Sequence, residues 1–94
     1  MIAALQREID RASADPSVRA VVIAANGPAF SSGHDLKELT ARRGDSDKGA
    51  AYFHEIMARC ATLMQSIVAC PKPVIAAVEG PASAAGCQLV SSCD

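Results

Sequence analysis

Two short apolar runs, each followed by a corner of very small residues, constrain the fold of this 94-residue chain more than any other feature. The first run is Val-Arg-Ala-Val-Val-Ile-Ala-Ala at 18–25, and the second is Val-Ile-Ala-Ala-Val at 74–78. Short β-branched runs bounded by turn residues predict strands, and nearly continuous apolar runs predict strands buried on both faces. Because a helical stretch separates the two runs, we expect two parallel strands joined by a helical crossover, an α/β arrangement.

Helical periodicity accounts for most of the remaining chain. Apolar residues recur at three- and four-residue spacing from Ile2 to Ala12, which predicts an amphipathic helix that Asp15-Pro16-Ser17 ends. A long helix is predicted from Ala50 to Ala69, stopped by Pro71-Lys72-Pro73. Its expected buried stripe consists of Phe53, Ile56, Met57, Cys60, Leu63, Met64 and Ile67.

Shorter segments complete an expected order of helix, strand, loop, helix, strand, loop and helix. Leu36 to Leu39 predicts a short helix, whereas the charged, glycine-containing residues 40–48 predict a surface loop. The segment from Gly86 to Ser91 has the composition of a helix N-terminus. Because the chain has no internal repeat, low-complexity tract or linker, we expect residues 1–94 to form one unit.

Charge and composition exclude several classes of protein. The formal net charge is −1, whereas nucleic-acid binding requires a clustered surplus of Lys and Arg. No apolar run reaches the roughly 18–20 residues of a membrane span, and the N-terminus lacks the basic and apolar regions of a signal peptide. The cysteine spacing fits neither a C-x-x-C pair nor a zinc site, so we expect no metal, a reducing compartment, and free thiols that pack as small hydrophobes: Cys60, Cys70, Cys87 and Cys93.

Both expected strands lead into corners of tiny residues, Phe30–Asp35 and Pro81–Gly86. Ligands of open α/β sheets bind beyond the carboxyl ends of the strands, and small residues there let backbone N–H groups approach a ligand. Two such corners side by side can supply two N–H donors to one oxygen, which forms an oxyanion hole. Composition alone leaves open the alternative that both corners are only tight turns.

The amino-acid sequences of the two corners, and their order along the chain, resemble motifs of the crotonase (enoyl-CoA hydratase/isomerase) superfamily. Residues 27–39, Gly-Pro-Ala-Phe-Ser-Ser-Gly-His-Asp-Leu-Lys-Glu-Leu, resemble the segment A-F-(S/C)-(A/S)-G-x-D-(L/I)-K. Residues 72–80, with Gly86-Cys87-Gln88-Leu89 and Cys93-Asp94, resemble K-P-(V/T)-I-A-A-V-x-G-x-(A/C)-x-G-G-G-x-E-L-x-x-x-C-D. The wording looks closest to the enoyl-CoA hydratase domain-containing protein 3 group, a branch whose activity is less well defined than that of the true hydratases.

The resemblance implies a fold and a set of site residues. The implied fold is a partial ClpP/crotonase-like spiral of parallel buried strands linked by helices, so that residues 1–94 would be a single incomplete domain. It assigns the two oxyanion N–H groups to His34 and Ala85, and the path of coenzyme A to Ser32, His34 and Lys37. Asp35 is expected to cap the short helix that follows it rather than to transfer a proton.

Gln88 stands at the position of the family's first catalytic glutamate, and the second would lie beyond Asp94. An amide can hold a water but cannot accept its proton at neutral pH, and losing a positioned acid or base costs about 10²–10⁴-fold in rate. Two functions therefore stay open. The first is an acyl-CoA hydratase or isomerase that polarises the thioester carbonyl, and the second is a non-catalytic acyl-CoA-binding or interaction protein.

The resemblance also implies a substrate and an assembly. Coenzyme A would be part of the substrate, with no separate cofactor, and the full-length protein would form a homotrimer or hexamer. The expected reducing compartment and the lack of a visible signal peptide predict the cytoplasm or the mitochondrial matrix as the location.

Two further residues carry groups that could take part in chemistry. A Clp-type serine hydrolase with Ser83 as nucleophile is a third interpretation, but no histidine follows Ser83, and a turn hydroxyl is favoured. Glu79 is expected to be a surface charge rather than a replacement acid.

Overall fold

The structure is a computed structural model that describes all of residues 1–94. Four α-helices, one 3-10 turn and two strands follow one another in the expected order. They are α1 (Ile2–Ala14), β1 (Val21–Ala24), α2 (Leu36–Ala41), η1 (Arg42–Gly44), α3 (Ala50–Ala69), β2 (Val74–Ala77) and α4 (Ala85–Ser92). None of these helices is long and apolar enough to cross a bilayer.

The two strands pair in parallel, as the sequence predicts, and α2, η1 and α3 form the connection between them. The register aligns Val21 with Val74 and Ala24 with Ala77. β1 is shorter than the predicted strand over 18–25, and proline explains where it begins. At this register Pro71 and Pro73 lie opposite the residues before Val21, and neither has an N–H to donate to the ladder. The first bond is donated by the N–H of Val21 to the carbonyl oxygen of Pro73, at 2.8 Å.

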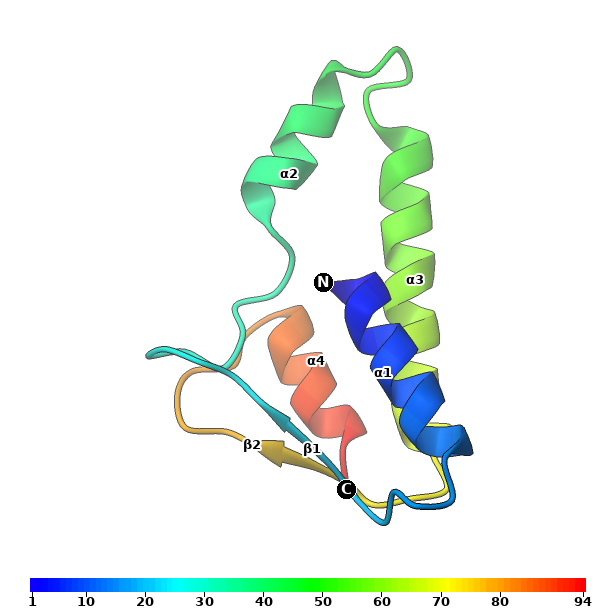
Figure 1. Cartoon of the computed structure of the whole chain (residues 1–94). Coiled ribbons are helices and arrows are strands. Elements are labelled where there is room, and N and C mark those ends of the chain that lie inside the picture. Colours follow the sequence, from blue (N-terminus) through cyan, green and yellow to red (C-terminus); the bar gives the residue numbers. More distant parts are fainter.

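The core lies on one side of this small sheet. Figure 1 shows α1, α3 and α4 gathered on that side, with α1 beside α3. Ile9 of α1, Leu63 and Ile67 of α3, and Val74 of β2 form one buried cluster. Leu89 and Cys93 from the last part of the chain pack against it. The cluster is aliphatic, because the chain has only three aromatic residues to bury.

The opposite face of the sheet is uncovered, so the expected burial of both strand faces is wrong for these residues. Val22 is 62% exposed and Ile75 is 48% exposed. The two are register partners and therefore lie side by side on that face. Side chains alternate between the faces of a strand, so Val21, Ile23 and Val74 face the helices while Val22 and Ile75 do not.

The segment from α2 to α3 forms an arm that extends away from the sheet (Figure 1). The predicted loop over 40–48 is partly helical, since α2 continues to Ala41 and η1 follows. Asp47 lies just before α3, and its carboxylate accepts hydrogen bonds from the N–H groups of Gly49 at 2.9 Å and Ala51 at 3.0 Å, at the start of that helix. The prediction for α3 itself is confirmed in its bounds but not in its whole stripe, because Met57 is 49% exposed.

Three of the four cysteines pack as the sequence predicts. Cys60 is buried, and Cys70 and Cys93 are half-buried against the aliphatic cluster. Burial, helped by the charge of Asp94, raises the pKa of the Cys93 thiol, which keeps it protonated. Cys87 differs, because it lies on the exposed side of α4. All four thiols are free.

Candidate functional site

The two corners of small residues meet. Parallel strands end at the same edge of a sheet, and beyond that edge Ser31 pairs with Ala82 in an isolated parallel bridge. The N–H of Phe30 donates to the carbonyl oxygen of Pro81 at 2.9 Å, and the N–H of Ser83 donates to that of Ser31 at 2.9 Å. The prediction of two adjoining corners is therefore confirmed by backbone hydrogen bonds.

Two glycines set how closely the corners approach. A Cβ at Gly86 would overlap the carbonyl oxygen of Ser31, a contact that side chains do not tolerate. A Cβ at Gly33 would lie 3.0 Å from the Cβ of Ala84 and 3.3 Å from the backbone nitrogen of Ala85. The missing side chain at Gly33 thus leaves the N–H of Ala85 uncovered.

The N–H groups of His34 and Ala85 donate to no acceptor within the chain. Among the neighbouring residues, Gly33 donates to the hydroxyl of Ser31 at 3.3 Å and Gly86 donates to the carbonyl of Ser83 at 2.9 Å, whereas the N–H groups of Asp35 and Ala84 also have no acceptor within the chain. Ala85 is the first residue of α4, where helix N–H groups have no intrahelical partner and the helix dipole is positive. The N–H groups of His34 and Ala85 are therefore among several unpaired backbone donors at this corner of the molecule.

Ala84 holds an unusual backbone conformation immediately before Ala85. Its φ is +53° and its ψ is −127°, a region that glycine normally occupies. Ala85 itself does not have a positive φ, so its methyl group imposes no strain. Conformations such as that of Ala84 cost about 1–3 kcal/mol and cluster at functional sites.

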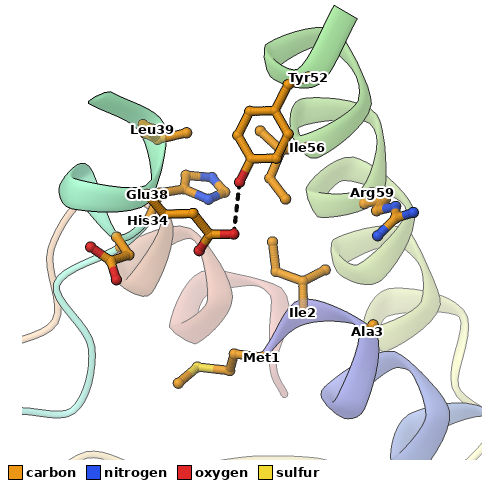
Figure 2. Close-up of a pocket in the computed structure, with 11 residues that line it drawn as sticks. Met1, Ile2, Ala3, His34, Glu38, Leu39, Tyr52, Ile56 and Arg59 are labelled. Atoms are coloured by element: carbon orange, nitrogen blue, oxygen red, sulfur yellow. Dashed lines mark hydrogen bonds between the residues drawn. The ribbon is translucent and has the colours of Figure 1, made fainter. Parts of the chain in front are cut away.

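Two cavities adjoin this corner. The smaller, of about 70 Å³, is mainly apolar and is bounded at the corner by Ser31, Gly33, His34 and Ala85. The larger, of about 450 Å³, shares Gly33 and His34 and extends along the arm. Its other walls come from the beginning of α1, from α2 and from α3 (Figure 2), with Ile2, Glu38, Leu39, Tyr52 and Ile56 among the lining residues.

Three of the remaining predicted residues, Gln88, Ser32 and Lys37, lie outside both cavities. Gln88 is one helical turn beyond Ala85, but its side chain is exposed and makes no hydrogen bond within the chain. Ser32 and Lys37 are also exposed, and the Lys37 ammonium forms no ion pair. Asp35 lines the larger cavity, and its carboxylate accepts the N–H of Lys37 at 2.9 Å, which confirms its capping role.

Sequence reasoning missed Glu38 and Tyr52. The hydroxyl of Tyr52 donates to Oε1 of Glu38 at 2.9 Å across the cavity, from α3 to α2 (Figure 2). Glu38 lies in the first turn of α2, but His34 precedes that helix, so no helical spacing connects the two residues in the sequence. The partnership with Tyr52 was not available from the sequence either, because it depends on how the arm folds back.

The other two candidates behave as ordinary surface residues. Ser83 is exposed, and its backbone completes the turn without any hydrogen bond from its hydroxyl to an imidazole. Glu79 is exposed and lines neither cavity. Neither residue therefore adds an acid, base or nucleophile to the corner.

Comparison with known proteins places this geometry in a family. The chain matches the enoyl-CoA hydratase/isomerase family over residues 1–94. It is 50% identical over its whole length to the mitochondrial enoyl-CoA hydratase domain-containing protein 3 of Xenopus laevis and 46% identical to the human protein. It spans 30% and 29% of those two proteins, so it corresponds to less than a third of their length.

Solved structures agree with the sequence matches. The enoyl-CoA hydratase of Mycobacterium smegmatis superposes with a TM-score of 0.88 at 49% identity, covering all of this chain and 35% of the other. Human enoyl-CoA hydratase domain-containing protein 3 superposes with a TM-score of 0.86 at 44% identity, covering 99% and 35%. The helices and the parallel strand pair thus form part of an α/β crotonase fold, and the chain belongs to the enoyl-CoA hydratase/isomerase family.

Proposed function

We propose that this chain is the part of an acyl-CoA-binding protein that polarises the thioester carbonyl. In this proposal the backbone N–H groups of His34 and Ala85 donate to one carbonyl oxygen and stabilise the enolate that forms from it. The observation that carries the proposal is that both donors are unpaired at the corner where the strand ends meet. Preorganised donors of this kind need no rearrangement when charge develops, which is why each contributes about 10²–10³ in rate.

Two features of the corner support this role. The α4 helix begins at Ala85, so its positive end adds to the potential at the proposed oxygen. Gly33 leaves room beside the Ala85 nitrogen, where a side chain would block a ligand. An exposed tight turn requires neither arrangement, and we therefore favour the oxyanion hole over the turn.

Gln88 limits the chemistry that the corner can perform. Its amide can orient a water molecule, but the proton must go to another group. Isomerisation, thioester hydrolysis and weak hydration share the same hole and differ in that second group. We infer a hydratase- or isomerase-type enzyme, with the non-catalytic acyl-CoA-binding protein as the alternative that Gln88 favours.

The coenzyme A path and the assembly complete the proposal. Exposed Ser32 and Lys37 flank His34, and the free ammonium of Lys37 suits a phosphate as a point-charge partner. The matched relatives from Xenopus and human carry the word mitochondrial in their names, which supports the matrix as the location. A homotrimer or hexamer is the proposed assembly of the full-length protein, to be checked by light scattering.

Hydration of crotonyl-CoA by the full-length protein, beside its Gln88→Glu variant, tests the function. Turnover by the unmodified protein supports a hydratase that needs one carboxylate at most. Activity confined to the variant shows that the hole is intact and that Gln88 alone prevents hydration. Binding of crotonyl-CoA without turnover by either form selects the binding protein, and the absence of binding contradicts the whole proposal.

A further inference from the structure

The larger cavity has a polar wall that an alkyl chain does not need. It begins at His34, beside the proposed thioester site, and passes between α2 and α3. Leu39 and Ile56 make part of it apolar, as an acyl chain requires. Glu38 and Tyr52 interrupt that apolar surface with a carboxylate and a phenol that point toward each other (Figure 2).

The carboxylate of Glu38 has an unused oxygen. Its Oε1 accepts the Tyr52 hydroxyl, while Oε2 accepts no hydrogen bond in the chain. No cation neutralises it, because Arg42 pairs with Asp45 and Arg59 pairs with Glu55. The Tyr52 hydrogen bond to Glu38 raises the pKa of the phenol, so Tyr52 stays a neutral donor. The cavity therefore presents a charged acceptor that still has room for a second donor.

Tyr52 is itself held in place from the other side. The guanidinium of Arg42 lies over its ring, 4.2 Å from the centroid, and the ring of Phe53 lies 6.0 Å away in an edge-to-face arrangement. These contacts fix the phenol and, through it, orient Glu38. Glu38 itself remains exposed to solvent, so a ligand donor would replace a hydrating water at its carboxylate.

We propose that Glu38 selects acyl chains that carry a neutral hydroxyl group, which donates to its free oxygen. The inference rests on the proposed acyl-CoA function and specifies its substrate class. An unsubstituted alkyl chain would take water from the carboxylate and return no donor. A chain ending in a carboxylate would meet Glu38 and Asp35 as like charges, whereas Arg59, the cation that lines the same cavity, is already paired with Glu55. A hydroxyl avoids both costs.

The test is calorimetric binding to the full-length protein of hexanoyl-, octanoyl- and decanoyl-CoA beside their ω-hydroxy and ω-carboxy counterparts. We expect one hydroxylated chain to bind about 10- to 100-fold more tightly than its alkyl match, as a hydrogen bond to a charged group predicts. We expect the ω-carboxy chain to bind most weakly. Equal affinity at every length, or preference for the alkyl or carboxylate form, overturns the inference.

Variants separate Glu38 from general effects on binding. Glu38→Met should remove the preference for the hydroxylated chain while alkyl-CoA binding is kept or improved. Tyr52→Phe should weaken the preference without abolishing it, because the carboxylate acceptor remains but loses the hydrogen bond that orients it. Glu8→Met, the same change on exposed α1 outside this cavity, should leave the preference unaltered.

The two proposals fail in different ways. If no acyl-CoA of any kind binds, the proposed function is wrong and the inference about its substrate falls with it. If acyl-CoA binds but Glu38→Met keeps the hydroxyl preference, the function stands and Glu38 is not the selecting residue.

Discussion

Each of the two strand-end corners contains a residue with positive φ and a glycine at a close contact, but the two corners place these features at different residues. In the corner at 31–35 the left-handed position is a glycine, Gly33, with φ +99°. In the corner at 82–86 the position with positive φ is Ala84, while the glycine, Gly86, stands in helix α4. At Gly86 the reason for glycine is space, because the carbonyl of Ser31 lies where a Cβ would be. A glycine in a sequence motif can therefore serve either of two purposes, a positive φ or a close backbone contact. The motif alone does not show which one applies.

The comparison also identifies where strain is kept. Ala84 has a backbone conformation that costs about 1–3 kcal/mol, and this conformation sets the orientation of the next N–H, that of Ala85, at the corner. The Cβ of Ala84 lies over Gly33, so the strained residue also closes the contact between the corners. Four substitutions test, in turn, the space at Gly86, the N–H donor of Ala85, the positive φ of Gly33 and the backbone strain at Ala84.

The largest effect is expected from Gly86→Ala. The new Cβ would meet backbone atoms of Ser31 that cannot move without breaking the bridge to Ala82, so we expect a loss of about 3 kcal/mol or more in the free energy of unfolding. Urea denaturation of the full-length protein measures it. Gly44→Ala, where a Cβ meets nothing within 4 Å, is the matched control and should be close to neutral. Similar values for the two variants would contradict the role assigned to close packing.

Ala85→Pro removes one proposed donor. Proline is tolerated at the first position of a helix, but it also restricts the residue before it, and Ala84 has φ +53°. The variant therefore tests the donor only where circular dichroism shows that α4 persists. We expect turnover, where the protein has it, to fall by about 10²–10³, and otherwise acyl-CoA affinity to fall. Ala85→Gly, which keeps the donor, should retain activity. Unchanged activity in the proline variant, with circular dichroism as before, would rule out this N–H as a catalytic group.

Gly33→Ala tests positive φ and partial crowding together. We expect a loss of about 1–2 kcal/mol in stability and a larger loss of acyl-CoA affinity, because the methyl group would stand 3.3 Å from the Ala85 nitrogen. Gly27→Ala shares the positive φ, at +93°, but its Cβ meets nothing within 4 Å. The pair should lose similar stability, and only Gly33→Ala should lose affinity, as thermal unfolding and calorimetry will show.

The smallest effect is expected from Ala84→Gly. Glycine relieves the strain at φ +53°, so stability should rise by about 1 kcal/mol, offset in part by the added freedom of the unfolded chain. Activity should fall modestly if the strain orients the Ala85 N–H. A destabilised variant would show that the contact of the Ala84 methyl with Gly33 outweighs the strain.

Much of the fold could be predicted from local sequence because its signals are local. The bounds of α3 follow from helical periodicity before Pro71-Lys72-Pro73, and the cap at Asp35 follows from the residue type. The parallel pairing of β1 and β2 follows from a helical crossover between two β-branched runs. In each case the deciding interaction lies within the segment or is forced by the connection.

The same sequence could not show which surfaces are covered or which distant side chains meet. Val22 and Ile75 read as core from their hydrophobicity, yet they are exposed because a strand face is buried only if another element packs on it. Glu38 and Tyr52 come together only because the arm returns along α3. The strained backbone at residue 84 could not be predicted either, because alanine is not a residue type that favours a positive φ.

By itself, then, the sequence determined the elements, their order and the identity of the two corners, since propensity, capping and periodicity act over a few residues. The tertiary structure decided that the corners bond through Ser31 and Ala82, that Gln88 lines neither cavity, and that Glu38 has a partner. These outcomes depend on strand register and on the path of the connection. Register and path are fixed by the packing of the whole chain, which no local pattern records.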